Sequence, residues 1–297
     1  MKGHFSKYHG LGNDYLVIDP KLVDVKLTPD AIRLICHRNF GVGSDGILYG
    51  PLGPSTVLRA GSKNLPQVRI FNPDGSEAEK SGNGLRIFAK YLFENKYVRT
   101  KKFKIKTLGG IVDVNILDDT ANNIRINMGK VTFVSTEIPV AGNKREVVNE
   151  TLVVNKVKYS VTCASIGNPH CIIPMAEVSE EKARQLGPFV ENHKMFPKRI
   201  NVQLLKVLDR NNIEIRIWER GAGYTLASGS SSCAAAATAY KLGLVGNKVN
   251  VKMPGGTLLV EIDKDWEIFM TGAVEGVFTG CFHADIEKRL SNKRCGF

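Results

Sequence analysis

The chain has 297 residues, of which 43% are hydrophobic and 24% charged, a balance typical of a globular protein. No run approaches the ~20 apolar residues of a membrane span, and the first residues lack a signal-peptide core, so we expect a cytoplasmic protein with no membrane partner. The net charge of +12 raises the question of nucleic-acid binding. However, the densest basic segment, residues 99–106, alternates Lys with apolar residues like a strand with one solvated face, and we expect no nucleic-acid partner.

The first half of the chain is predicted to consist mainly of strands, with two helices. Thr28 before Pro29 predicts a helix that runs to about His37. A glycine loop at residues 39–46 follows it, and a second helix is expected over residues 85–95. The strands expected in this half are 4–19 with a turn at 10–13, 47–49, a hairpin within 50–67 whose loop lies near 61–64, 68–72, 103–107, 111–116 and 123–128.

The second half is predicted to repeat this order. Strands are expected within residues 131–173, then a polar helix over 179–186 and an alanine-rich helix over 230–242. The remaining expected elements are strands at 201–208, 213–218, 249–253, 257–262 and 267–271, and a short helix at 285–290.

An internal repeat explains this similarity of the two halves. Ile70-Phe71, Ser81-Gly82 and Val98 recur with the same spacing as Ile217-Trp218, Ser228-Gly229 and Val245. Near the front of each half, LGNDYLVI resembles IGNPHCII. A repeat of this length is usually one supersecondary unit used twice.

The repeat predicts an α+β fold with two pseudo-symmetric lobes, each a β-sheet wrapped around a central helix. We expect an N-terminal lobe at residues 1–128, on which the tail 282–297 packs, and a C-terminal lobe at residues 129–281. Each Ser-Gly pair opens a helix, whose first N–H groups have no partner inside the helix and can bind an anion. The functional interpretation is that the two helix N-termini face each other across an interlobe cleft; the structural alternative is that both serines are ordinary N-caps.

Six motifs in order along nearly the whole chain resemble the diaminopimelate epimerase family, whose members are amino-acid epimerases and racemases independent of pyridoxal phosphate. They are FSKYHGLGNDYLVID, NPDGSEAEKSGNGLR, IGNPHC, RINVQ, WERGAGYTLASGSSSCAAAA and MPGG. The resemblance implies interconversion of LL- and meso-diaminopimelate for lysine and cell-wall synthesis, with no cofactor and no metal. The expected partner is a small-molecule amino-acid substrate, and a homodimer stays open.

The resemblance also implies two catalytic cysteines, one removing the α-proton and the other returning a proton from the opposite face. The matching residues here are Ser81 and Ser228. A serine hydroxyl is a far weaker acid than a thiol and needs an adjacent base. His170 is a further candidate for orienting substrate or assisting proton transfer.

The other positions implied by the resemblance are intact. Gly82, Asn83, Gly229 and Ser230 would donate N–H groups to the α-carboxylate. The amino and carboxyl groups at the far end of the substrate would be held by Asn13, Asn72, Asn168, Asn201, Glu219 and Arg220.

Three interpretations of the serines stay open. The chain is an engineered Cys→Ser variant of an epimerase, a divergent racemase or isomerase with another substrate or other acid–base groups, or a catalytically inactive amino-acid-binding relative. Lys80 and Tyr224 also depart from the family pattern, which favours natural divergence, and either could supply an acid–base group. Cys233, inside the helix after Ser228, is expected to serve in packing.

Overall fold

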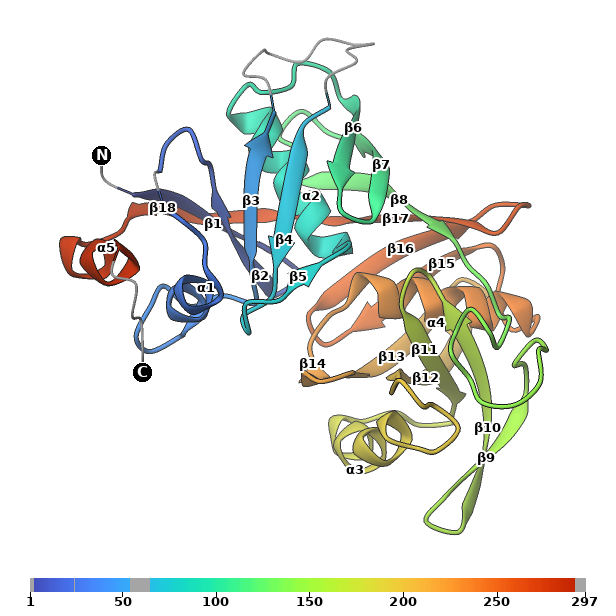
Figure 1. The fold of residues 1–297 in the computed structure, drawn as a ribbon. Helices are drawn as coiled ribbons and strands as arrows, with labels where there is room; N and C mark the ends of the chain where they lie inside the picture. The colour runs from blue at the N-terminus through green and yellow to red at the C-terminus, as the bar shows by residue number, and fades with distance from the viewer. Residues whose placement is uncertain (1–2, 24, 54–64, 292–297) are drawn as a thin grey trace. The chain divides into compact units, whose positions relative to one another are not determined.

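The computed structural model describes residues 3–23, 25–53 and 65–291, so the expected loop near residues 61–64 lies outside the described residues. Helices in the described part of the chain are α1 (Pro29–Cys36), α2 (Gly82–Glu94), α3 (Glu180–Glu191), α4 (Gly229–Lys241) and α5 (Ala284–Ser291) (Figure 1). The chain divides into two compact units. Unit 1 contains the residues up to Ile126 and those from Gly272 onward, and unit 2 runs from Asn127 to Thr271.

The strands divide between the two halves of the chain. The first half contributes β1 (His4–Gly10), β2 (Asn13–Ile18), β3 (Ile47–Leu52), β4 (Gln67–Phe71), β5 (Glu77–Ala78), β6 (Lys102–Thr107), β7 (Gly110–Ile116) and β8 (Asn123–Lys130). The second half contributes β9 (Glu150–Val154), β10 (Val157–Ser165), β11 (Pro169–Pro174), β12 (Asn201–Asp209), β13 (Asn212–Glu219), β14 (Gly223–Thr225), β15 (Lys248–Met253), β16 (Gly256–Ile262), β17 (Glu267–Ala273) and β18 (Glu275–Cys281).

The strand pairing confirms the predicted duplication. In unit 1, β1 and β2 are antiparallel, β2 and β3 parallel, β3 and β4 antiparallel, β4 and β6 parallel, and β6 and β7 antiparallel. In unit 2, β10, β11, β12, β13, β15 and β16 pair in the same sequence of orientations. The short strands β5 and β14 also match, because each is antiparallel to the strand that enters the Ser-Gly turn. The α+β fold with two similar halves is therefore correct.

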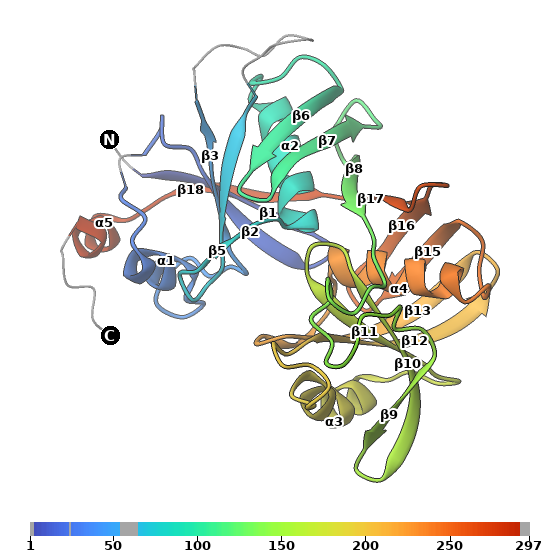
Figure 2. The same ribbon diagram turned by 45° about the vertical axis from the view of Figure 1, so that its right-hand side comes forward.

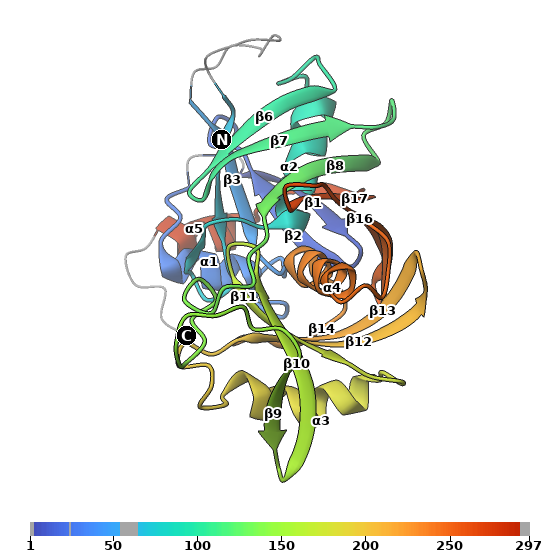
Figure 3. The same cartoon turned by 90° about the vertical axis from the view of Figure 1, so that its right-hand side faces the viewer.

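Each unit has a central helix inside its sheet. Figure 2 shows α2 against strands of unit 1, where it contacts β1, β2, β3 and β7. Helix α4 contacts β10, β11, β12, β13, β15 and β16. Figure 3 shows β12, β13 and β16 curving around it. Residues 231–239 of α4 are all buried. Their small side chains, mostly alanine, let the sheet approach the helix backbone on every side.

The end of the chain differs from the expected lobe boundary. The predicted C-terminal lobe ended at residue 281, whereas the structure places residues from Gly272 onward in unit 1. The reason is β18, which pairs antiparallel with β1 along most of its length. This strand was not predicted, because EGVFTGC contains two glycines and its residues are nearly all exposed, so no alternation of buried and exposed residues marks it.

The described tail continues the packing of unit 1. Phe282 is buried in a hydrophobic cluster with Phe5 and Leu16, and Ile286 and Leu290 of α5 pack against the same cluster. Within the described ranges, no helix is both long and apolar enough to cross a membrane.

Candidate active site

Ser81 begins the central helix of unit 1. It has an extended backbone, and its Oγ accepts a hydrogen bond of 3.0 Å from the Gly84 N–H, as an N-cap residue does. The N–H groups of Gly82 and Asn83 lie in the first turn, where α-helical geometry supplies no partner inside the helix. This helix end therefore carries the predicted serine, with two N–H donors directly after it.

Tyr15 is a site residue that the sequence did not reveal. Its hydroxyl lies 3.0 Å from Ser81 Oγ, and its side chain is buried in β2. Either oxygen can donate in this bond. The Ser81 hydroxyl is thus held between a backbone donor and a phenol, two groups that together fix its position.

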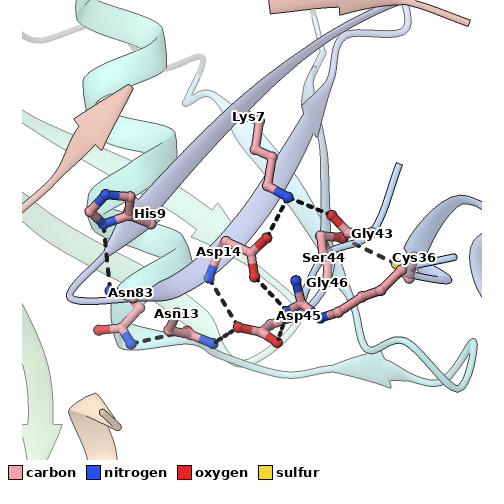
Figure 4. Close-up of polar contacts among 12 residues, drawn as sticks. Lys7, His9, Asn13, Asp14, Cys36, Gly43, Ser44, Asp45, Gly46 and Asn83 are labelled. Carbon is pink, nitrogen blue, oxygen red and sulfur yellow. Dashed lines mark hydrogen bonds and ion pairs between the residues drawn. The ribbon is translucent and has the colours of Figure 1, made fainter. Parts of the chain in front are cut away.

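Asn13 and Asn83 are brought together in unit 1. Asn13 begins β2, and its Oδ1 accepts a 3.0 Å hydrogen bond from Asn83 Nδ2 in the first turn of α2. Asn83 Oδ1 accepts in turn from Nη2 of the buried Arg86 at 2.9 Å. At the other end, Asn13 Nδ2 donates to Asp45 Oδ2 at 3.0 Å (Figure 4). The two predicted asparagines are therefore members of one chain of hydrogen bonds.

Asp45 also belongs to a charged cluster. Arg38 Nη2 contacts Asp14 Oδ1 at 2.8 Å and Asp45 Oδ1 at 2.7 Å, and Lys7 Nζ lies 2.8 Å from Asp14 Oδ2. Burial raises the pKa of Asp14, but the bonds from Arg38 and Lys7 outweigh it and hold that pKa below its usual value. Burial, together with the nearby Asp14 carboxylate, raises the pKa of Asp45. Two cations thus keep two neighbouring carboxylates in place.

Asn72 holds a turn instead. Its Nδ2 donates to Ser76 Oγ at 3.0 Å, and its backbone N–H donates to the Ser76 carbonyl at 2.9 Å. These bonds close the NPDGS turn between β4 and β5. The described contacts do not join the Asn72 side chain to the Asn13–Asn83 pair.

Ser228 begins the central helix of unit 2 in the same way. It is buried and extended, and the Ser231 N–H lies 3.5 Å from its Oγ, a longer bond than that of Ser81. Gly229 and Ser230 form the first turn that follows. The second predicted serine therefore also occupies an N-cap.

Asn168 joins Ser230 to His170. Its Nδ2 donates to Ser230 Oγ at 3.3 Å, and its Oδ1 lies 2.9 Å from His170 Nε2. Asn168 and Ser230 are the repeat counterparts of Asn13 and Asn83, so the same pair of positions is joined in both units. Because Asn168 Oδ1 accepts, the His170 proton is on Nε2. His170 Nδ1 and Gln203 Oε1 are buried without a hydrogen-bond partner.

His170 should make the stability of the fold depend on pH. Burial lowers its pKa from 6.5 to about 3, and the Arg220 charge adds to the shift while Gln203 opposes it. As the pH falls, His170 therefore takes up a proton in the unfolded chain before it does so in the folded chain. Above pH ~6.5 the free energy of unfolding does not change with pH through this residue. It falls as the pH drops from there toward the folded pKa, by at most about 1.36 kcal/mol per pH unit. We expect the free energy of unfolding in urea to fall by about 2 kcal/mol from pH 7 to pH 5 through this residue. His170→Gln should remove that part of the fall.

His283→Gln is the matched control for this prediction, because the His283 side chain is 78% exposed. It should keep the full pH dependence of the starting protein. Equal pH dependence in the His170→Gln and His283→Gln variants would contradict the assignment.

Asn201 and Arg220 are also brought together. Asn201 begins β12, and its Nδ2 donates to the Pro169 carbonyl at 2.8 Å while its Oδ1 accepts from the Arg220 N–H at 3.0 Å. Arg220 follows Glu219 in the turn between β13 and β14, where the Arg220 side chain is exposed and that of Glu219 half-buried. The Asn201 amide thus ties the turn to the strand that carries His170.

The Glu191 carboxylate, which the sequence pattern did not single out, supports the turn between β13 and β14. Glu191, at the end of α3, is buried and accepts from Trp218 Nε1 at 2.7 Å and from the Gly221 N–H at 2.9 Å. It also accepts from Arg199 Nη1 at 3.2 Å. These bonds hold the turn from both sides of Glu219 and Arg220. The sequence predicts that this helix ends at residue 186, whereas α3 continues to Glu191, so the sequence did not mark this carboxylate.

Tyr224 and Lys80, the two further candidates for an acid–base group, lie in different surroundings. Tyr224 pairs with Trp218 across β13 and β14 and has the Arg184 guanidinium 4.9 Å from its ring centroid. Burial and the Glu180 charge raise the pKa of Tyr224, which makes it a weaker acid. Lys80 is half-buried beside Ser81. Cys233 is fully buried in α4, as expected of a packing residue.

Among the residues that the structure describes, no three His, Cys, Asp or Glu side chains are grouped closely enough to hold a metal ion. None of the described cysteines is in a disulfide bond; Cys281 is exposed and the others are buried.

Comparisons with known proteins place this geometry in a family. The family model for diaminopimelate epimerase matches residues 5–134 and 162–277. The chain is 53% identical over 282 residues to "Diaminopimelate epimerase 2" of Nostoc sp., covering 95% of this chain and 96% of that protein. It is 38% identical over 286 residues to the diaminopimelate epimerase of Moorella thermoacetica, covering 95% of this chain and 100% of the other.

Solved structures share the fold at low sequence identity. A probable proline racemase from Agrobacterium radiobacter superposes with a TM-score of 0.69 at 14% identity, covering 95% of this chain and 93% of that one. A hydroxyproline epimerase from Agrobacterium vitis gives 0.67 at 12% identity, covering 94% and 90%. With the family model and close relatives spanning nearly the whole sequence, the chain belongs to the diaminopimelate epimerase family.

Proposed function

We propose that this protein is a cofactor-independent isomerase that interconverts LL- and meso-diaminopimelate, a step in lysine biosynthesis. The observation that carries the proposal is the 53% identity, over 95% of the chain, to a relative named as a diaminopimelate epimerase. The proposal includes a cytoplasmic location and an amino-acid substrate as the partner.

The local geometry supports chemistry at an acidic α-carbon. Helices α2 and α4 each present N–H groups at Gly82 and Asn83 and at Gly229 and Ser230, suited to a carboxylate and to the charge that develops when the α-proton leaves. Ser81 and Ser228 immediately precede these donors. In the proposal they occupy the positions of the two proton-transferring groups, and the substrate's polar ends are bound by Asn13, Asn72, Asn168, Asn201, Glu219 and Arg220.

The proposal gives His170 a supporting role in proton transfer. Its pKa of about 3 keeps the imidazole neutral at pH 7, so it acts as a hydrogen-bond donor that fixes the Asn168 amide. For Ser81, the Tyr15 hydroxyl at 3.0 Å is a group that can exchange a proton. A serine needs such a neighbour before it can act on a carbon acid.

A second candidate function is amino-acid binding without turnover. The observation that favours it is that both serines already accept a hydrogen bond from the helix they begin. A capping hydroxyl stabilises the fold whether or not it transfers protons.

The test is to incubate the protein in D₂O with LL- and meso-diaminopimelate and follow loss of the α-proton signal by NMR, with binding measured by calorimetry. We expect binding of both isomers, and exchange if the epimerase proposal is correct. Binding without exchange would leave the amino-acid-binding function. Failure to bind either isomer would overturn both.

A further inference from the structure

The hydrogen-bond chain through Asn13 and Asn83 ends on one side in a group that can only donate and on the other side in a group that can only accept. At one end, the Arg86 guanidinium can only donate, and it contacts Asn83 Oδ1 at 2.9 Å. At the other end, the Asp45 carboxylate, paired with Arg38, can only accept, and it receives Asn13 Nδ2 at 3.0 Å. Figure 4 shows Asn83, Asn13 and Asp45 in this sequence.

These two end groups determine the orientation of the side-chain amides of Asn13 and Asn83. An amide can rotate by half a turn and exchange its oxygen and nitrogen with little change of shape. Because Arg86 donates, Asn83 must offer it the oxygen and thus turn its nitrogen to Asn13. Asn13 must then accept with its oxygen and donate to Asp45 with its nitrogen. Reasoning from Asp45 backward gives the same orientations, so a reversal of either amide would set donor against donor or acceptor against acceptor.

We infer that Asp45 is a positioning residue, which together with Arg86 locks the Asn13 and Asn83 side chains so that they offer ligand N–H groups. In each amide the oxygen already accepts within the chain, while in the described residues the second Nδ2 hydrogen has no partner. The ligand group that meets this pair is therefore an acceptor, such as a carboxylate oxygen. This inference rests on the proposed function only in its choice of ligand.

The placement of Asp45 suits this role. It lies in the glycine loop between α1 and β3, and the same Oδ2 also accepts the Asp14 N–H at 3.0 Å, next to Asn13 in β2. One oxygen thus binds the Asn13 side chain and the backbone of the following residue. An aspartate whose only purpose was to neutralise Arg38 would not need to accept these two hydrogen bonds from β2.

The experiment compares three variants for binding of meso-diaminopimelate by calorimetry. Asp45→Leu has a similar size but no acceptor, so it should weaken binding at least about 10-fold, as expected for loss of a hydrogen bond to a charged group. Asp45→Asn keeps an acceptor oxygen toward Asn13, because the Arg38 side chain is 58% exposed and can move away. It should stay within about threefold of the starting protein.

Arg38→Gln is the matched control. It removes the guanidinium that Asp14 and Asp45 share yet leaves Asp45 as the acceptor for Asn13, so binding should again stay within about threefold. Wild-type affinity in folded Asp45→Leu would overturn the inference. So would an equal loss in Asp45→Leu and Arg38→Gln, because the charged cluster as a whole would then be responsible.

A second measurement needs neither a variant nor a ligand. In the protein labelled with ¹⁵N-asparagine, the Asn13 Nδ2 hydrogen that is bonded to Asp45 should exchange with water at least about 10-fold more slowly than the Nδ2 hydrogens of the exposed Asn143. Exchange as fast as that of Asn143 would show that the Asn13 amide is not locked. If the protein failed to bind diaminopimelate but showed slow exchange, the proposed function would fall and the positioning of Asn13 would stand.

Discussion

Cysteine at positions 81 and 228 should raise the rate of α-proton exchange in diaminopimelate by a factor on the order of 10² to 10⁴, the usual range for a positioned acid–base group. A helix N-terminus lowers the pKa of a thiol to between about 3.5 and 7.5, which makes a thiolate available at neutral pH, whereas serine stays protonated. Ser81 and Ser228 lie at such N-termini. The rate would be measured by NMR in D₂O with the starting protein and the Ser81→Cys/Ser228→Cys variant.

The chain contains a matched control for this experiment. Ser179 is the N-cap of α3 and accepts from the Lys182 N–H at 3.1 Å, much as Ser81 and Ser228 do. Ser179→Cys makes the same chemical change outside the candidate site, and should lower stability by about 0.5–2 kcal/mol without raising exchange. If the serine protein already matched the double cysteine variant in rate, other groups would carry the protons, and Tyr15 beside Ser81 would be the first to replace.

Removing the Glu191 carboxylate should cost about 1–3 kcal/mol of folding free energy. Glu191→Ala leaves the half-buried Trp218 indole N–H without its acceptor, whereas the N–H of the exposed Gly221 can bond to water instead. The turn that carries Glu219 and Arg220 should loosen with it, so ligand affinity should fall as well. Urea unfolding, followed by tryptophan fluorescence, would measure the change.

Glu177→Ala provides the comparison for Glu191. Glu177 pairs with Lys206 at 2.9 Å, but its side chain is 72% exposed. Surface ion pairs contribute about 0–1 kcal/mol, so this variant should be nearly as stable as the starting protein. Similar losses in the Glu177→Ala and Glu191→Ala variants would mean that burial of the Glu191 contacts has little energetic importance.

The sequence predicted the features that repeat locally. The serine caps and glycines recur with fixed spacing, and the strand pairing of the two units follows the same order. Such signals survive in a sequence because they depend on near neighbours along the chain. The link between Asn168 and Ser230 repeats that between Asn13 and Asn83, but it was not predicted, because the two residues of each pair lie 62 and 70 positions apart in the sequence.

Contacts between segments distant in the sequence were not predictable in the same way. Tyr15 meets Ser81, and Asp45 meets Asn13, only after β2, β3 and α2 pack together. Before that packing, Tyr15 is an aromatic strand residue and Asp45 an acid in a glycine loop. The strand β18 went unrecognised for the related reason that its partner, β1, lies at the opposite end of the chain.

The discontinuity of unit 1 has a consequence during synthesis of the protein. Unit 2 is one continuous segment, so all its strands can pair before β18 is synthesised. Strand β1, by contrast, is synthesised long before its partner β18 and cannot pair with it until residues 275–281 follow. At bacterial or eukaryotic rates of 5–20 residues per second, the interval is roughly 13–55 s. During that time the edge of β1 is unpaired and Phe5 lacks its packing partner Phe282, so the nascent chain exposes an aggregation-prone strand that the finished protein covers.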